Sequence, residues 1–146
     1  MDELIQAMKK ALADTFAFYL KAHGFHWNVE GRTFCQDHQL ISNIYEEVYS
    51  SIDQFAEEIR AMDAYAPASF ARFSELTSIE DEIKILNAQG MFEKLLADNS
   101  IVLASIEQAY ELAEASHNHG LSNFLAERQD AHAKHGWQLR ATLKQR

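Results

Sequence analysis

Residues 38–59 read HQLISNIYEEVYSSIDQFAEEI, and this stretch decides the fold because two different stripes run along it at helical spacing. One stripe is apolar and recurs every three or four residues, which is the pattern of a helix that buries one face. It consists of Leu40, Ile41, Ile44, Val48, Ile52, Phe55 and Ile59. The pattern extends from Thr33 to about Met62, so we predict one long amphipathic helix there.

The second stripe is polar and lies on another face of the same predicted helix. At ~100° per residue, its members fall within about 100° of one another around the helix axis. They are His38, Ser42, Glu46, Tyr49, Asp53 and Glu57. Imidazole nitrogens together with carboxylate oxygens suit iron among other divalent metals. The stripe is therefore a candidate metal site, and the plainer interpretation is a row of solvated helix residues.

The two ends of the polar stripe cannot bind one metal within a single helix. Fifteen residues at ~1.5 Å rise place His38 and Asp53 ~22 Å apart along the axis, whereas metal–ligand bonds are about 2 Å long. An antiparallel second copy, related by a two-fold axis between residues 45 and 46, would bring His38 opposite Asp53 of its partner. His26 would join His38 from the same side. The geometry makes a shared site feasible without showing that metal binds.

Helical patterns also fill the rest of the chain. We predict helices at residues 2–27 and 33–62, a long third helix that starts at the polar residues 77–81, and a fourth over 121–143. Pro67 breaks helix, a short helical piece is expected over Phe70–Leu76, Gly90 is a candidate kink, and Gly120 is a candidate stop. Four long helices with one long connection, about 63–78, predict an all-α four-helix bundle with a crossover.

Composition sets further bounds on the class of protein. The chain has 146 residues with five Gly and one Pro, which favours a single helical domain over 1–146. A formal net charge of −9 disfavours nucleic acid and anionic lipid as partners. No apolar run approaches the ~20 residues that span a bilayer, and the opening MDELIQAMKK does not resemble a signal peptide. A lone cysteine, Cys35, fits a reducing compartment, so we expect a cytoplasmic location and a packed, inert thiol.

The motif HWNVEG at 26–31, followed by His38 and then by Asp53 and Glu57, resembles the ferroxidase signature of the Dps proteins, the mini-ferritins. The segments MFEKLLADN at 91–99 and FLAERQDAHAKHGWQLRATL at 124–143 are similar to the corresponding helices of that family. The resemblance covers nearly the whole chain. It implies a ferritin-like four-helix bundle with a short extra helix in the second connection, assembled into a hollow dodecamer.

The resemblance also implies an activity and a set of site residues. Dps proteins oxidise Fe(II), preferring hydrogen peroxide to oxygen, and store the ferric mineral inside the shell, which limits hydroxyl-radical damage. By the match, His26 and His38 of one subunit and Asp53 and Glu57 of its two-fold mate hold the iron. Trp27 matches the aromatic residue beside that site, which quenches radicals.

Three departures from the family pattern qualify these expectations. Many members carry an acid at the position of Ser42, so a second, weaker iron position loses a carboxylate here. The family's ion entrance near the start of the last helix is usually lined by Asp, whereas residues 117–123 read HNHGLSN. Basic tails that bind DNA are missing, and twelve subunits at −9 each would carry −108, so we expect no DNA compaction.

Other histidines and other functions remain open at this point. Four C-terminal histidines form a possible second metal cluster, although most such groups are ordinary helix residues: His117, His119, His132 and His135. His23 is either an outer neighbour of the site or an exposed residue, and Glu46 is either a mineral-nucleating acid or a surface acid. The rivals to a ferroxidase are a ferritin-like shell that binds metal with little turnover and a DNA-protecting architectural protein.

Overall fold

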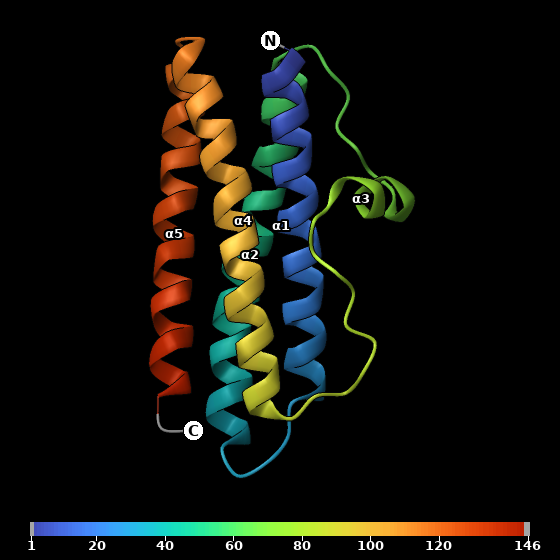
Figure 1. The fold of residues 1–146 in the computed structure, drawn as a ribbon, viewed down its shortest axis with the longest axis vertical. Helices are drawn as coiled ribbons and strands as arrows, with labels where there is room; N and C mark the ends of the chain where they lie inside the picture. Colours follow the sequence, from blue (N-terminus) through green and yellow to red (C-terminus); the bar gives the residue numbers. More distant parts are fainter. Residues whose placement is uncertain (1, 145–146) are drawn as a thin grey trace.

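The computed structural model describes residues 2–144, and its helices form one bundle (Figure 1). The elements are α1 (Asp2–Asn28), α2 (Phe34–Ala61), α3 (Phe70–Leu76), α4 (Ala88–Ala115) and α5 (His119–Leu143). Over these residues the structure contains helices and no strand. It confirms the predicted all-α fold: four long helices with a short one in the long second connection.

The apolar stripe of α2 forms the centre of the core, as its spacing predicted. Ile41, Ile44, Val48, Phe55 and Ile59 are all inaccessible to solvent. Burying a side chain of this size contributes ~1.5–3 kcal/mol, so this face holds α2 in place far more strongly than helix propensity could. None of the helices within residues 2–144 is both long and apolar enough to cross a membrane.

The connection between α2 and α4 runs the length of the bundle along the outside of α1, and α3 lies within it (Figure 1). Because of this crossover, α2 and α4 run parallel, whereas α1 and α2 form an antiparallel pair, as do α4 and α5. The Phe73 ring of α3 stacks on Phe16 of α1 with 4.7 Å between ring centroids. The crossover lies against α1, and within residues 2–144 the polar face of α2 stays exposed at Glu46, Asp53 and Glu57.

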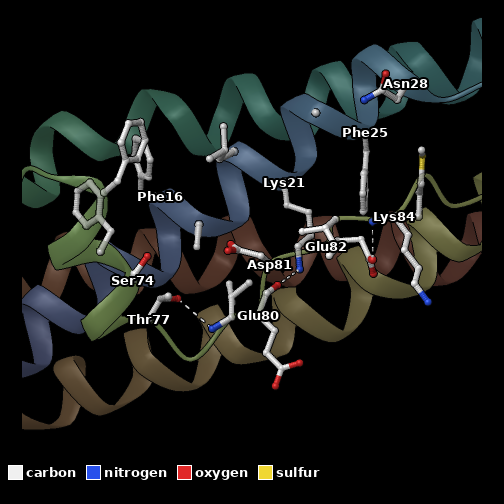
Figure 2. Close-up of a pocket in the computed structure, with 18 of the residues that line it drawn as sticks. Phe16, Lys21, Phe25, Asn28, Ser74, Thr77, Glu80, Asp81, Glu82 and Lys84 are labelled. Atoms are coloured by element: carbon white, nitrogen blue, oxygen red, sulfur yellow. Dashed lines mark hydrogen bonds between the residues drawn. The ribbon is translucent and has the colours of Figure 1, made fainter.

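Two charged side chains of α1 fasten the crossover to the bundle. The fully buried Asp14 accepts hydrogen bonds from the Thr77 hydroxyl at 2.7 Å, from the Ser78 amide at 2.8 Å and from Lys10 Nζ at 2.7 Å. Lys21 donates to the Glu80 carbonyl at 2.7 Å, which Figure 2 shows across the groove between α1 and the connection. The bonds to Thr77, Ser78 and Glu80 join groups roughly 60 residues apart in the sequence, whereas Lys10 and Asp14 are one helical turn apart.

The predicted start of the third long helix at 77–81 is wrong. The helix begins at Ala88, where the side chain of Asn87 accepts a hydrogen bond from the Gly90 amide. Thr77 and Ser78 resemble a helix cap in sequence, but their hydrogen-bonding groups are taken up by Asp14 of α1. Gly90 consequently lies in the first turn of α4 and not at a kink in its middle.

The predicted stop at Gly120 is also wrong, because α4 ends at Ala115 and His117 takes the left-handed position just beyond it. His117 adopts a left-handed φ of 58°, the Asn118 amide donates to the Ala113 carbonyl, and the His117 amide donates to the Glu114 carbonyl. This is the Schellman arrangement, in which glycine usually takes the left-handed position. A histidine holds it here, so Gly120 falls inside the first turn of α5.

Removing the carboxylate that fastens the crossover should weaken the whole fold. Asp14→Ala leaves the Thr77 hydroxyl and the Ser78 amide without their acceptor and removes the ion pair with Lys10, so we expect the free energy of unfolding to fall by about 2–3 kcal/mol. Urea denaturation at one fixed protein concentration measures this, since assembly also contributes to stability.

A matched control is Glu75→Ala in α3, which removes an exposed ion pair with Arg72. That change should cost no more than about 0.5 kcal/mol. Equal effects of the two substitutions would contradict the assigned role of Asp14.

Candidate metal centre

The polar stripe of α2 lies on the outer face of the bundle. His38 and Ser42 are half-buried, and Glu46, Tyr49, Asp53 and Glu57 are exposed. Helix α2 is uninterrupted from Phe34 to Ala61, so the long axial separation between His38 and Asp53 holds in the structure. The stripe thus presents an imidazole near one end of α2 and two carboxylates towards the other.

His26 and His38 come together across the turn between α1 and α2. Their rings stack with 3.7 Å between centroids and 15° between planes. Nδ1 of His26 lies 2.9 Å from the His38 carbonyl oxygen, and Nδ1 of His38 lies 2.7 Å from the His26 carbonyl oxygen. The His26 carbonyl belongs to the last turn of α1, where carbonyls lack helical partners, so His38 also caps that helix.

These reciprocal bonds determine which ring nitrogen carries the proton. A carbonyl oxygen can only accept a hydrogen bond, so Nδ1–H is the donor in both rings. In the neutral imidazole the lone pair then lies on Nε2. Histidines that bind metals characteristically donate their second ring N–H to a carbonyl or carboxylate in this way. Two stacked imidazoles with free Nε2 lone pairs are a preorganised pair of nitrogen ligands.

The two acids of the stripe form a separate group. Asp53 and Glu57 line a shallow depression on α2 whose other residues are Ser50, Gln54, Glu58 and Ala61. Within residues 2–144, no three His, Cys, Asp or Glu side chains lie close enough together to hold a metal ion. The described chain therefore carries a pair of imidazoles and a separate pair of carboxylates, which do not meet within it.

Aromatic side chains surround the histidine pair. The Tyr45 ring lies 5.1 Å from His26, centroid to centroid, and stacks on His23 at 3.9 Å. Trp27 lies 4.3 Å from His23 and is 62% exposed. His23 is thus a half-buried neighbour of the imidazole pair that packs between Trp27 and Tyr45. Its burial, and next the charge of His26, lower the pKa of His23, while Glu46 opposes the shift.

Comparison with known proteins identifies the family. The sequence model of the ferritin-like domain family matches residues 5–146. The chain is 31% identical to DNA protection during starvation protein 2 of Bacillus anthracis over 143 residues, which cover 98% of each protein. The chain belongs to the Dps proteins of the ferritin-like family.

Solved Dps structures share the whole fold. Dps from Vibrio cholerae, described as a member of a broad superfamily of ferritin-like diiron-carboxylate proteins, is 27% identical with a TM-score of 0.93. That match covers 98% of this chain and 90% of the other. Dps from Thermosynechococcus elongatus has a TM-score of 0.95 at 23% identity, covering 99% and 92% of the two chains, and supports the fold alone.

This Dps chain has Ser42 at a position where many family members carry an acid, and the nearby Glu46 supplies a carboxylate. The hydroxyl of Ser42, one turn after His38, donates to Glu46 Oε1 at 3.2 Å. Glu46 is exposed on the same stripe, one further turn along α2. The acid of the stripe that follows His38 therefore stands one helical turn later, at Glu46, than the acid that many family members carry at the position of Ser42.

The four C-terminal histidines do not form one cluster. His117 and His119 are exposed at the turn between α4 and α5, with 6.2 Å between ring centroids. His132 and His135 are buried inside the bundle about four turns farther along α5. Any metal site at the turn would therefore have to use the exposed pair alone.

His132 and His135 belong to a buried polar network that joins α2, α4 and α5. Arg128 makes a two-pronged ion pair with Glu47 of α2 at 2.6 and 3.0 Å, and His135 Nε2 lies 2.8 Å from the same carboxylate. His132 Nδ1 donates to Asn99 Oδ1 at 2.7 Å, and Arg128 Nη2 donates to His132 Nε2 at 3.3 Å. Both histidines therefore bond to other side chains of the fold. Arg128 bonds to His132 and shares the Glu47 carboxylate with His135.

The electrostatics of this network follow from its burial. Burial first, and then the neighbouring Arg128 and His135, hold the pKa of His132 well below its ordinary value. Burial would raise the pKa of Glu47, but hydrogen bonds from His135 and Arg128 outweigh it and hold that pKa far below the ordinary range. The network therefore contains a neutral His132 and an ionised Glu47 at neutral pH.

Two features of this region escaped the sequence reasoning. The expectation that Cys35 is packed is wrong, because it is exposed in the first turn of α2. The aromatic group of Tyr19, His23 and Tyr45 was not predicted, although the four-residue spacing of Tyr19 and His23 places them on one helix face. Its third member comes from α2, and the sequence does not show how the faces of α1 and α2 meet.

The buried His132 makes stability depend on pH. Below the ordinary pKa of 6.5 the unfolded chain protonates His132 while the folded chain does not, so stability falls as the pH drops below about 6.5. Glu47 adds a further loss below its ordinary 4.5, because only the unfolded chain then takes up the proton. The free energy of unfolding can be measured by urea denaturation at several pH values between 7.5 and 5. It should change less with pH in His132→Gln than in the parent. The exposed His119→Gln is the control and should keep the pH dependence of the parent. If His132→Gln also keeps it, the assignment is contradicted.

Proposed function

We propose that this Dps protein is a ferroxidase and iron store. It oxidises Fe(II), with hydrogen peroxide as the preferred oxidant, and sequesters the ferric mineral in a hollow dodecameric shell. The observation that carries the proposal is the reciprocal bonding of His26 and His38, which leaves both Nε2 lone pairs available to a metal. The reducing compartment expected for a protein with one exposed thiol suits the handling of Fe(II).

In this proposal the iron site lies between two-fold mates. His26 and His38 of one subunit face Asp53 and Glu57 of the other, so each pair of subunits builds two equivalent sites. Support comes from the uncovered outer face of α2 and from the two half-sites that one subunit leaves incomplete. Packing α2 against its own copy would cover this face and complete both sites at once.

Iron is the substrate of the reaction. The carboxylates of Asp53 and Glu57 offset the charge of the incoming Fe(II), which rises further on oxidation, and the imidazoles complete the ligand set. Two Fe(II) ions give two electrons, and one hydrogen peroxide with two protons becomes two water molecules. Because both electrons reach the same peroxide, no hydroxyl radical is released. Trp27, in contact with His23, would quench radicals that do escape.

Two rival functions are disfavoured by particular observations. A metal-binding shell with little turnover would follow from the weakened second iron position at Ser42, but Glu46 lies one turn away on the same face. A DNA-compacting role is opposed by the formal net charge of −9 per chain, which repels the phosphate backbone.

The carboxylate half-site provides the direct test of iron oxidation. Replacing both acids by their amides, Asp53→Asn with Glu57→Gln, keeps the side-chain volumes but removes the two negative charges. We expect the initial rate of Fe(II) oxidation by peroxide to fall by about 100-fold, because Fe(II) loses half of its ligands. Stopped-flow absorbance at two Fe(II) per site measures the rate.

The matched control is Glu58→Gln, which removes an acid from the same depression but from outside the polar stripe. Its rate should stay within about twofold of the parent, as expected for a surface change away from the site. A parent protein whose iron oxidation is no faster with peroxide than without it would overturn the proposed function.

A further inference from the structure

A chain of aromatic contacts joins the imidazole pair to Tyr19, which lies two turns before His26 on α1. The Tyr45 ring lies 5.1 Å from His26, and Tyr45 lies 6.1 Å from Tyr19. The His23 ring stacks on the Tyr45 ring, with 3.9 Å between ring centroids and 14° between ring planes. The contacts with His26 and Tyr19 lie in the range of packed aromatic pairs, and the stacked pair is closer still. Tyr45 therefore links the candidate iron site to Tyr19, and His23 lies beside this route with its ring 6.1 Å from His26 and 5.5 Å from Tyr19.

Tyr19 differs from the other tyrosines of this group in having a base beside its hydroxyl. The Tyr19 hydroxyl lies 2.9 Å from His23 Nδ1. Over residues 2–144, neither the Tyr45 nor the Tyr49 hydroxyl makes a comparable side-chain hydrogen bond. Tyr19 is half-buried, whereas Tyr49, whose ring lies 4.9 Å from Tyr19, is 57% exposed.

That hydrogen bond matters because a phenol loses its proton when it loses an electron. An imidazole lone pair at hydrogen-bond distance can accept the proton in the same step, which avoids forming a high-energy cationic phenol. A tyrosine with such a partner is easier to oxidise than a tyrosine without one. Of the tyrosines in this group, Tyr19 is the one with that arrangement.

We propose that Tyr19 is a redox-active residue that supplies one electron to peroxide at the iron site, with Tyr45 as the relay and His23 as the proton acceptor. This inference rests on the proposed ferroxidase function. It applies to a site that holds a single Fe(II), a state that the absence of a carboxylate at Ser42 itself would favour. A site that holds one Fe(II) can give only one of the two electrons that peroxide needs.

The step balances with Tyr19 as the second donor. One Fe(II) becomes Fe(III), Tyr19 becomes the neutral phenoxyl radical, and its proton moves to His23 Nδ1. Hydrogen peroxide takes both electrons and two protons from solvent, and its O–O bond breaks to give two water molecules. The next Fe(II) returns an electron to the radical, and His23 returns the proton. No hydroxyl radical leaves the site.

The test is rapid-freeze electron paramagnetic resonance of the assembled protein, mixed with one Fe(II) per site and then with peroxide. The parent should give a tyrosyl signal whose hyperfine structure changes when tyrosine is ring-deuterated. Tyr19→Phe should remove most of that signal, because phenylalanine has no phenolic hydroxyl to lose a proton on oxidation. His23→Gln keeps the phenol but removes the base, and it should lower the signal to the same degree.

Tyr49→Phe is the matched control, because it removes a hydroxyl from the ring next to Tyr19 without touching the hydrogen bond. Its tyrosyl signal should equal that of the parent. A spin trap gives a second readout: hydroxyl-radical adducts should increase in Tyr19→Phe and in His23→Gln but not in Tyr49→Phe. A change in packing alone would not produce this pattern.

The outcomes separate the inference from the function on which it rests. If the parent does not oxidise Fe(II) faster with peroxide, the proposed function fails. If the parent oxidises iron but shows no tyrosyl signal, or if Tyr19→Phe keeps the signal of the parent, the function stands and the role of Tyr19 is wrong. A signal that disappears in Tyr49→Phe would assign the radical to the exposed tyrosine instead.

Discussion

The pair of hydrogen bonds between His26 and His38 is the interaction on which the proposed site depends. Each Nδ1–H donates to the other residue's carbonyl oxygen, so one contact joins the end of α1 to the start of α2 and sets the tautomer of both rings. The imidazoles then need no reorganisation to bind a metal through Nε2. The same contact places Tyr45 and His23 next to the site, because His26 can meet Tyr45 only when α1 and α2 pack in this register.

The rigidity of α2 adds the second constraint. Along an uninterrupted helix the imidazoles and the carboxylates stay far apart, and no motion of side chains could bring them to one ion. The proposed site therefore needs a second subunit, and in this proposal iron oxidation depends on assembly. Inside the bundle, by contrast, Glu47, Arg128, His132 and His135 bond to one another within one chain, so these two histidines contribute to the fold.

Helical periodicity in the sequence predicted the bundle, the short helix and the polar stripe, because each depends on spacing within one segment. It failed at residues 77–87, because whether Thr77 caps a helix depends on Asp14, which lies more than 60 residues away. It failed at His117 because a residue other than glycine took the left-handed position. The tautomers of the imidazole pair and the Tyr19–His23 bond depend on three-dimensional packing, and neither could be predicted from spacing alone.

Complementation between two inactive variants tests the shared iron site most directly. One variant, His26→Ala with His38→Ala, lacks the imidazoles, and the other, Asp53→Ala with Glu57→Ala, lacks the carboxylates. Unfolded together and reassembled in equal amounts, they should regain about a quarter of the parent's peroxide-dependent iron oxidation, since random pairing across a two-fold axis rebuilds that share of sites. Each variant alone should stay inactive. A mixture that remains as inactive as its components, although mass spectrometry shows mixed shells, would contradict a site built from two subunits.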